Sequence, residues 1–492
     1  MGPRFRQACR VPEPPPKHSA AHSHVRNDQY MDDWEKAYKE LEALSCGDPT
    51  SQEGPAPIQG RRQGLSLAQQ IAQQGSRSQH EPAAPRARTS MAQQLEQQNA
   101  SPHQFAMHRA HQPERSSKTS RGPVRNAGKA PERCPPAVTR GWTQGPVDPQ
   151  GILCDLSDRP NMCSAACWDK NEVVIGSSDH ALYVVDAEKG TLKRTLYNKT
   201  NGHTEWVTCC TYTGSGHIVS GGMDSKLWVW PGGGVRGVEL QGHAGPVSQV
   251  AWDESSGLVA SAGYDKTIRL WDVGGRGREV ACLAGHVAPV LEMVPQGGLI
   301  ASGDRSGNII VWDTASGAEA WRLKKKAHDG HVTALEWWDA GDPAADGCFV
   351  SGGQDGCVRV WDPRQHTLVA KMELHVNDKG RGAAGDVCAG GSAAGGMLVS
   401  AGADGTLAIT DPRTWGLVKQ IRLSNFPYSM MAAGGLALVG LGDGSLWVIQ
   451  CSSGKVFYCL GANKHAVRCL EATYDKLVTS GDDGNMVLYH FN

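Results

Sequence analysis

The sequence predicts an all-β protein: a β-propeller over residues 151–492, preceded by a largely disordered arm with one short amphipathic helix. Three observations support this prediction. A unit of about forty to fifty residues recurs along the second part of the chain, and this period is typical of propeller blades. Each unit contains short apolar, β-branched runs separated by tight polar turns, the pattern of strands. The 60 glycines and 15 tryptophans suit many turns and one repeated tryptophan.

The clearest unit runs from Gly242 to Asp272 and reads GHAGPVSQVAWDESSGLVASAGYDKTIRLWD. It opens with Gly-His and closes with Trp-Asp, with two apolar runs and a polar turn between them. The unit resembles a WD40 repeat, because these separated features agree within one window of the expected length. The resemblance covers residues from about 151 to 492 and none of the arm.

An aspartate in the turn, six residues before the repeated tryptophan, marks eight units along the chain. It falls at Asp179, Asp224, Asp265, Ser306 (a substitution), Asp355, Asp404, Asp443 and Asp483. The tryptophan position then reads Val185, Trp230, Trp271, Trp312, Trp361, Thr410, Ile449 and Tyr489. We therefore predict eight blades, with seven as the alternative if the degenerate first, sixth or seventh unit is not a separate blade.

The last unit ends on its third strand, so its outer strand must come from before the first unit. The short apolar-alternating run Ile152–Leu156 is the candidate. Closing the ring in this way removes strand edges that would otherwise be exposed.

The resemblance implies a buried hydrogen-bonded tetrad of His, Ser or Thr, Asp and Trp in each well-formed blade. Three units carry it in full: His203, Ser220, Asp224, Trp230; His243, Ser261, Asp265, Trp271; and His328, Ser351, Asp355, Trp361. The fourth keeps His286, Ser302 and Trp312 but has Ser306 for the aspartate, and the eighth has Asn463, Thr479, Asp483 and Tyr489. The other three units lack most of the set. On paper these groups look like catalytic triads, but an enzyme needs one site, and repetition indicates a structural network.

The resemblance also implies where a partner binds, because WD40 propellers mostly bind peptides or proteins on the narrower face around the central channel. The positions that build this face in the family correspond to Trp206, Met223, Tyr264, Arg305, His331, Tyr428 and Arg468. Aromatic residues, Met and Arg are enriched in protein interfaces. The alternative is that Trp206 and Tyr264 only pack between neighbouring loops.

A second motif suggests a narrower role. Asp355 to Arg364 reads DGCVRVWDPR and resembles the WDxR box with which substrate receptors dock on the adaptor of cullin–RING ubiquitin ligases; the docking residues would be Asp355, Trp361, Asp362 and Arg364. Asp411-Pro-Arg413 is a weaker copy. WDxR also occurs in propellers without a ligase link, where the Arg pairs with a nearby Asp. A third hypothesis is a cytoskeletal or ciliary scaffold.

Composition excludes other classes. The 15 cysteines are odd in number and form no CxxC pair, which favours free thiols in a reducing compartment. The N-terminus lacks the apolar stretch of a signal peptide, and the longest apolar run, Tyr428–Gly442, is too short to cross a bilayer. We expect a soluble cytoplasmic protein, with the nucleus or cytoskeleton as alternatives. Without a phosphate loop, a metal-spaced cluster or a unique triad, we expect no enzyme, no cofactor, no bound metal, no membrane contact and no specific nucleic acid.

The arm, residues 1–147, carries 20 lysines and arginines against 13 aspartates and glutamates, while the rest of the chain carries 29 against 37. Its Pro, Ser, Gln and Gly content is typical of disorder. Residues 31–44 differ, because Trp34, Tyr38 and Leu41 fall on one helical stripe. Such a helix needs a surface, either a partner's groove or this chain's own propeller.

A short motif occurs twice in the arm, as SLAQQIAQQ at 66–74 and SMAQQLEQQ at 90–98. Two copies of one motif suggest a bivalent peptide ligand. The alternative is that the two segments are similar only because the linker is rich in Gln. The scattered basic residues lack neighbouring aromatics, so a solvated linker is the default interpretation.

Overall fold

The structure is a computed structural model that describes residues 141–197, 201–275, 277–338, 347–376, 383–389 and 394–492. The predicted arm helix, with Trp34, Tyr38 and Leu41, lies outside these residues. So do both predicted arm motifs, at 66–74 and 90–98.

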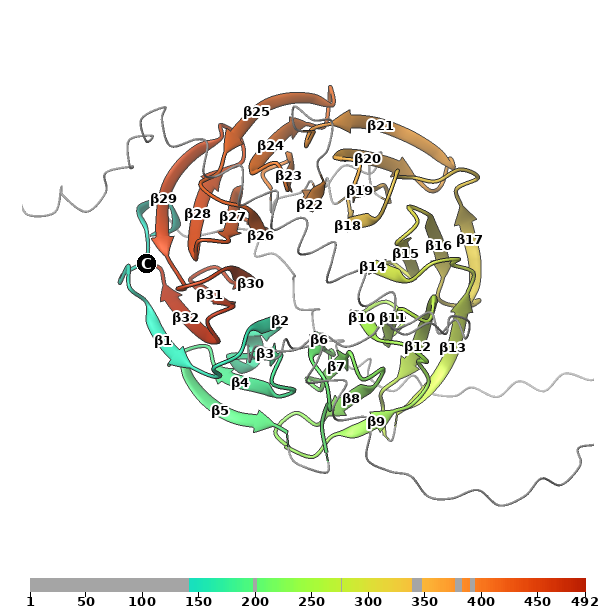
Figure 1. Ribbon diagram of the computed structural model, residues 1–492, viewed down its shortest axis with the longest axis horizontal. Coiled ribbons are helices and arrows are strands. Elements are labelled where there is room, and N and C mark those ends of the chain that lie inside the picture. The colour runs from blue at the N-terminus through green and yellow to red at the C-terminus, as the bar shows by residue number, and fades with distance from the viewer. Residues whose placement is uncertain (1–140, 198–200, 276, 339–346, 377–382, 390–393) are drawn as a thin grey trace, which may run out of the picture. The chain divides into compact units, whose positions relative to one another are not determined.

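Eight antiparallel sheets of four strands each stand around a central axis, with the first strand of every blade innermost and the fourth outermost (Figure 1). The eight-blade prediction is confirmed, and the degenerate units each form a blade. Blades 1 to 4 comprise β2 (Asn161–Cys167), β3 (Glu172–Ser177), β4 (Leu182–Asp186), β5 (Thr191–Leu196); β6 (Val207–Tyr212), β7 (Ile218–Gly222), β8 (Leu227–Trp230), β9 (Val238–Leu240); β10 (Val247–Asp253), β11 (Leu258–Gly263), β12 (Thr267–Asp272), β13 (Arg278–Ala284); and β14 (Val290–Gln296), β15 (Leu299–Asp304), β16 (Ile309–Asp313), β17 (Ala318–Arg322).

Blades 5 to 8 complete the ring. They comprise β18 (Val332–Trp337), β19 (Phe349–Gly353), β20 (Cys357–Asp362), β21 (Thr367–Glu373); β22 (Ala384–Ala389), β23 (Leu398–Gly402), β24 (Thr406–Asp411), β25 (Gly416–Arg422); β26 (Pro427–Ala433), β27 (Leu436–Leu441), β28 (Ser445–Gln450), β29 (Lys455–Gly461); and β30 (Val467–Ala472), β31 (Lys476–Gly481), β32 (Asn485–His490), β1 (Ile152–Asp155). A short 3-10 helix, η2 (Trp168–Lys170), follows β2.

The innermost strands are linked from blade to blade by side chains near their first residues. The pairing of β6 with β7 shifts register between Val207 and Cys209, and β10 shifts similarly after Val247. The hydroxyl of Thr208, inside the first shift, donates to the carbonyl of Val247 at 2.5 Å, and Ser248 donates to Val290 at 2.7 Å. These bonds link blade 2 to blade 3 and blade 3 to blade 4.

The last blade closes the ring as predicted. β1 pairs antiparallel with β32, with Ile152 opposite Leu488 and Asp155 opposite Asn485. Both ends of the propeller therefore share one sheet, and unfolding of either end must break this sheet.

A short segment before β1 also packs on the last blade, although the sequence analysis placed it in the arm. The one-turn helix α3 (Gly141–Gln144) buries Trp142 completely. Its indole stacks on Phe491 with ring centroids 3.9 Å apart, and Nε1 donates to the carbonyl of Tyr474 at 2.7 Å. The backbone N–H of Gly141 donates to Asn492 at 3.1 Å. The packed part of the chain therefore includes residues 141–144, which precede Gly151.

Candidate functional site: the narrow face and the tetrads

The predicted narrow face is the end of the ring where the first strand of each blade begins and the second strand ends. One backbone hydrogen bond recurs there in all eight blades. The residue before the first strand accepts, at 2.8 to 3.0 Å, from an N–H of the following turn: Pro160 from Ser178, Trp206 from Met223, Pro246 from Tyr264, Pro289 from Arg305, His331 from Gln354, Ala383 from Ala403, Phe426 from Gly442 and Ala466 from Asp482. Five of the seven predicted partner-binding residues take part in this bond, namely Trp206, Met223, Tyr264, Arg305 and His331, while Tyr428 and Arg468 are the second residues of β26 and β30.

Blades 2 and 3 place aromatic side chains on this face. Trp206 is 43% exposed, although tryptophan is usually buried, and Met223 and Tyr264 are partly buried. By contrast, Trp230 and Trp271, which belong to tetrads of the same two blades, are at most 1% exposed. Trp206 lies immediately before β6, and its backbone carbonyl accepts from the N–H of Met223 at 2.9 Å, so its backbone is tied to the blade while its indole stays at the surface.

Blades 4 and 5 place polar side chains on the same face. The Nε of Arg305 donates to Nε2 of His331 at 3.4 Å. The backbone N–H of His331 donates to the side-chain oxygen of Gln354 at 3.2 Å. The first bond links blade 4 to blade 5, and the second joins the residue before β18 to the turn after β19 within blade 5.

Blades 7 and 8 form a more closed group. The guanidinium of Arg468 donates to both carboxylate oxygens of Asp482 and lies over the ring of Tyr428, 5.0 Å from its centroid. Phe426 meets Tyr428 edge-on with centroids 5.0 Å apart. Asp482 and Tyr428 therefore already engage Arg468, which leaves less of its binding capacity for a partner than an exposed side chain would have.

The tetrads lie inside the blades, just below this face. In blade 2, His203 contacts Ser220 Oγ through Nε2 at 2.9 Å and Asp224 through Nδ1 at 3.0 Å, and Trp230 donates to Ser220 Oγ at 3.0 Å. The corresponding three distances are 2.8, 2.9 and 2.8 Å in blade 3 (His243, Ser261, Asp265, Trp271) and 2.7, 2.9 and 2.8 Å in blade 5 (His328, Ser351, Asp355, Trp361).

The Ser-His-Asp sets are structural by their geometry. The serines of blades 2, 3 and 5 are 0% exposed, and each hydroxyl also accepts the indole N–H, so no substrate can approach the oxygen. Burial alone would raise the pKa of Asp224, but the hydrogen bonds from His203 and from backbone N–H groups outweigh it and lower that pKa. The carboxylate is therefore held charged as an acceptor.

Blade 4 has a complete tetrad, so the expectation that its aspartate is lost at Ser306 is wrong. The aspartate is Asp304, two residues earlier, and its Oδ2 lies 3.1 Å from Nδ1 of His286. In blade 2 that strand position is Gly222, where a Cβ would come within 2.6 Å of the histidine ring and 2.8 Å of Asp224. The two positions are coupled because only one of them can place a side chain against the histidine.

Blade 6 keeps three members of the tetrad, which corrects the expectation that it lacks most of the set. His375 contacts Ser400 at 2.8 Å and Asp404 at 3.2 Å. The sequence pattern missed this histidine because the connection between it and the serine is longer than in the other blades. Its position just after the fourth strand of blade 5 could have identified it. The remaining position is Thr410, which is 0% exposed and whose hydroxyl contacts no partner within the described part of the chain.

Substituted sets serve blades 8, 1 and 7. In blade 8, Asn463 donates to Asp483 at 2.9 Å and accepts from Thr479 at 3.0 Å. In blades 1 and 7 a serine instead of a histidine bonds to the turn aspartate. Ser157 donates to Asp179 at 2.6 Å, and Ser424 donates to Asp443 at 2.9 Å. Even the degenerate units thus anchor the turn aspartate.

The WDxR motif lies at the opposite end of blade 5. The guanidinium of Arg364 forks onto Asp362 at 3.0 and 3.2 Å, and its side chain is 48% exposed. Asp355 and Trp361 belong to the tetrad, and Trp361 is only 5% exposed. Of the four predicted docking residues, only Arg364 is thus open to a partner. The weaker copy has the same fork, with Arg413 on Asp411 at 3.0 and 2.7 Å.

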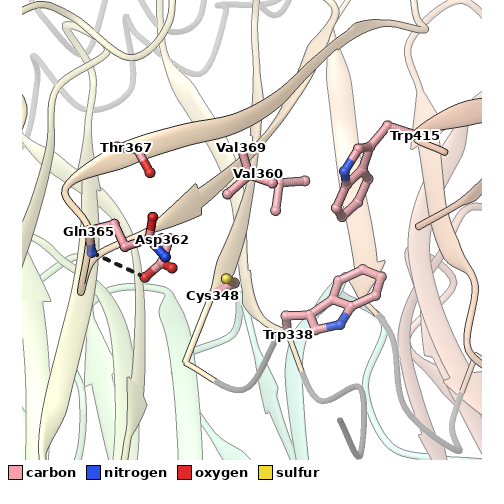
Figure 2. Close-up of a pocket in the computed structure, with 8 residues that line it drawn as sticks. All are labelled: Trp338, Cys348, Val360, Asp362, Gln365, Thr367, Val369 and Trp415. Carbon is pink, nitrogen blue, oxygen red and sulfur yellow. Dashed lines mark hydrogen bonds between the residues drawn. The ribbon is translucent and has the colours of Figure 1, made fainter. Parts of the chain in front are cut away.

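A cavity of about 380 Å³ lies beside this motif, between blades 5 and 6. Figure 2 shows two tryptophans on one side and polar groups on the other. Its lining comprises Trp338, Cys348, Val360, Asp362, Gln365, Thr367, Val369 and Trp415. The two indoles meet edge-on with centroids 5.7 Å apart, and Gln365 donates its backbone N–H to Asp362 at 3.4 Å.

Among the described residues, no group of three or more His, Cys, Asp or Glu side chains is arranged to hold a metal ion. None of their helices has both the length and the apolar character needed to cross a membrane.

Comparison with known proteins agrees with this geometry. The family described as "WD domain, G-beta repeat" matches residues 190–231, 234–272, 277–313 and 321–362. The chain is 30% identical over 176 residues to a ribosome biogenesis protein WDR12 homolog of Chlamydomonas reinhardtii (28% of this chain, 38% of that protein). It is 26% identical over 211 residues to the anaphase-promoting complex subunit cdc20 of Dictyostelium discoideum (41% of each chain). It thus spans about two fifths of the length of these curated relatives.

Solved structures show the same fold at low identity. Sqt1 of Saccharomyces cerevisiae superimposes with a TM-score of 0.62 at 12% identity, covering 70% of this chain and 99% of Sqt1. The computationally designed protein Ika8 superimposes with a TM-score of 0.59 at 22% identity, covering 70% of this chain and 100% of Ika8. The chain thus carries four repeats that match the WD40 family model, and it folds as an eight-bladed β-propeller with recurring His-Ser-Asp-Trp networks.

Proposed function

We propose that this protein is an interaction scaffold that binds a peptide or protein partner on the narrow face of its propeller. The observation that carries the proposal is the exposure of Trp206, 43%, immediately before β6 on the same face as Met223 and Tyr264. A tryptophan that packs only between loops would be buried, as the tetrad tryptophans are. Exposed aromatic groups on a preorganised surface are the usual anchors of protein interfaces.

The test is affinity purification of partners with the full chain and with Trp206→Ala plus Tyr264→Ala. Truncation of an interface anchor costs about 2 kcal/mol or more, so the double variant should lose most of the captured partner. The matched control is Tyr474→Ala, which removes a 56% exposed aromatic ring from the opposite end of the blades. If the double variant captures partners as the unchanged protein does, the narrow-face proposal is wrong.

A second candidate function concerns the opposite end of blade 5. We propose that Arg364 docks on a protein adaptor, with the cullin–RING ligase adaptor as the specific candidate. The support is a guanidinium that remains 48% exposed while its fork on Asp362 fixes its direction, next to the cavity that Trp338 and Trp415 line. The fork itself also fits the plainer role of an intramolecular ion pair.

Arg364→Ala should abolish capture of the adaptor if this candidate is correct. Arg413→Ala is the control, because it removes the same kind of fork from blade 6, where the side chain is 84% exposed. Capture of no adaptor by the unchanged protein, or equal capture by Arg364→Ala, would reject the ligase-receptor hypothesis and leave the narrow-face proposal intact.

A further inference from the structure

Three consecutive lysines stand in the connection between β17 and β18 (Figure 1). Lys324, Lys325 and Lys326 are all exposed. Within the part of the chain that the structure describes, their ammonium groups make no ion pair and no hydrogen bond. Other lysines of the propeller are paired, such as Lys226 with Glu239 at 3.5 Å and Lys371 with Glu373 at 2.7 Å.

The connection that carries the lysines is fixed to the narrow face. Immediately after Lys326, the N–H groups of Ala327 and His328 donate to the carbonyl of Gly307 at 2.7 and 3.2 Å. Gly307 belongs to the same turn as Arg305, and His328 is the buried histidine of the blade 5 tetrad. The lysine run therefore stays beside the blade 4 and 5 part of the narrow face.

The polar groups of this region are mainly hydrogen-bond donors. Arginine and lysine side chains can only donate. The one ring nitrogen of His331 that accepts is engaged by Arg305, and the side-chain oxygen of Gln354 is engaged by the N–H of His331. A ligand that complements this surface must supply acceptors.

The nearby carboxylates do not cancel the positive charge. Asp304 and Asp355 are engaged in tetrads, and Glu319 forms an ion pair with Arg322 at 2.7 Å. Asp329 is the one exposed carboxylate within the connection of residues 323–331. A positive patch is thus set on a propeller sequence in which acidic residues outnumber basic ones, 37 to 29.

We propose that an anionic peptide segment, carrying carboxylates or phosphates, docks on the lysine patch, defined as Lys324, Lys325, Lys326, Arg305 and His331. This inference rests on the proposed function and names the chemistry of the partner. The partner places an apolar side chain on Trp206 and Tyr264 of blades 2 and 3, and its anionic segment on blades 4 and 5. Peptide is favoured over single-stranded nucleic acid, because the patch contains no Trp, Tyr or Phe ring on which successive bases could stack, and the imidazole of His331 is already engaged by Arg305.

The experiment measures fluorescence anisotropy of fluorescein-labelled peptides with the full chain. The probes are decaglutamate, a peptide of five Gly-phosphoserine repeats, and decaglutamine as the neutral reference. The variant Lys324→Ser, Lys325→Ser, Lys326→Ser should weaken binding of an anionic probe about tenfold, because each exposed charge pair contributes modestly. The control Lys464→Ser removes an exposed lysine from the narrow-face turn before β30 and should bind normally.

Tighter binding of decaglutamate identifies carboxylates as the source of the charge, and tighter binding of the phosphoserine peptide identifies phosphates. Equal binding of the unchanged protein to decaglutamine and to both anionic probes would overturn the proposal, as would an unchanged affinity of the triple variant or an equal loss in Lys464→Ser. A decauridylate that binds more tightly than either peptide, and is lost in the triple variant, would replace the peptide with nucleic acid.

The two proposals fail separately. Partner capture that survives Trp206→Ala with Tyr264→Ala rejects the narrow-face anchor, whatever the anisotropy shows. Suppose instead that the double variant loses the partner but the anionic probes bind the triple lysine variant as tightly as the unchanged protein. That result keeps the scaffold function and rejects the lysine patch.

Discussion

Replacing Asp304 by alanine should destabilise the propeller, whereas replacing Ser306 by alanine should not. Asp304 is fully buried and accepts hydrogen bonds from His286 at 3.1 Å, from the backbone of Ser306 at 2.9 Å, and from the backbone and side chain of Asn308 at 2.9 to 3.1 Å. Ser306 Oγ makes no comparable contact in the described part of the chain. The repeat pattern in the sequence would favour the opposite ranking, because Ser306 holds the turn position.

The magnitude follows from the donors that the substitution leaves behind. The ring N–H of His286 is fully buried and would lose its acceptor, at a cost of about 1–3 kcal/mol. Ser306 and Asn308 are partly exposed, so water can replace their bonds at a smaller cost. The sum is about 2–4 kcal/mol. Unfolding entropy of about 2.1 cal/mol/K per residue over roughly 340 residues converts this loss into a Tm lower by about 3–6 °C.

The assay is thermal unfolding followed by circular dichroism, for the unchanged protein, Asp304→Ala and Ser306→Ala. The reasoning is refuted if Asp304→Ala has the same Tm as the unchanged protein, or if Ser306→Ala lowers Tm as much as Asp304→Ala does.

The dependence of stability on pH supplies a second test. Burial alone would raise the pKa of Asp304, but hydrogen bonds from His286 and Asn308 outweigh it and lower that pKa below its ordinary value of 3.8. A carboxylate whose pKa is lowered by folding stabilises the folded state at pH values above its ordinary pKa. This stabilisation is lost as the pH falls through the lowered pKa. The difference in Tm between Asp304→Ala and the unchanged protein should therefore be constant near neutral pH and should disappear in acid.

Three further predictions, which use substitutions and truncations, test the packing. Trp142→Ala removes a fully buried indole and should cost about 3–5 kcal/mol in thermal unfolding, whereas Trp206→Ala, which removes a 43% exposed indole, should change Tm by less than about 1 °C; equal Tm values for the two variants would contradict the assigned burial. A fragment of residues 141–492 should remain folded, and a fragment of 151–492 should melt earlier because it lacks Trp142; coincident melting curves would show that this tryptophan adds nothing. Thr410→Val replaces a buried, unpartnered hydroxyl with a methyl group of similar shape, and we expect a stabilisation of about 1 kcal/mol, measured as an increase in Tm; a decrease would show that the hydroxyl is satisfied.

Much of the fold could be predicted because each blade repeats a local code. The turn aspartates, the strand pattern and the closing run Ile152–Leu156 are visible as residues at fixed spacings, and the structure forms eight blades with β1 on β32. The spacing failed where the chain deviates from its own repeat. Asp304 was missed because it occupies a strand position that is glycine in blade 2, and His375 because a longer connection separates it from Ser400.

The candidate site was predictable only as a set of positions. The family pattern placed Trp206, Arg305 and Arg468 on the same face, and the structure places Trp206 and Arg305 in the recurring backbone bond and Arg468 two residues after Ala466, which takes part in it in blade 8. It could not distinguish Arg468, which is engaged by Asp482 and stacked on Tyr428, from the exposed indole of Trp206, because those contacts join side chains of different blades or turns.

The sequence by itself therefore predicted the class of fold and eight blades, with seven left as the alternative, and its resemblance to the WD40 family implied the tetrads of the regular repeats. These features depend on contacts within one unit, where spacing along the chain fixes spacing in the sheet. Only the tertiary structure decided that Trp142 belongs to the last blade, that Asp304 completes the fourth tetrad, and that the connection carrying three exposed lysines is hydrogen-bonded to the turn of Arg305. Those facts depend on how distant or irregular segments pack, because burial and pairing are properties of the assembled ring and not of any one repeat.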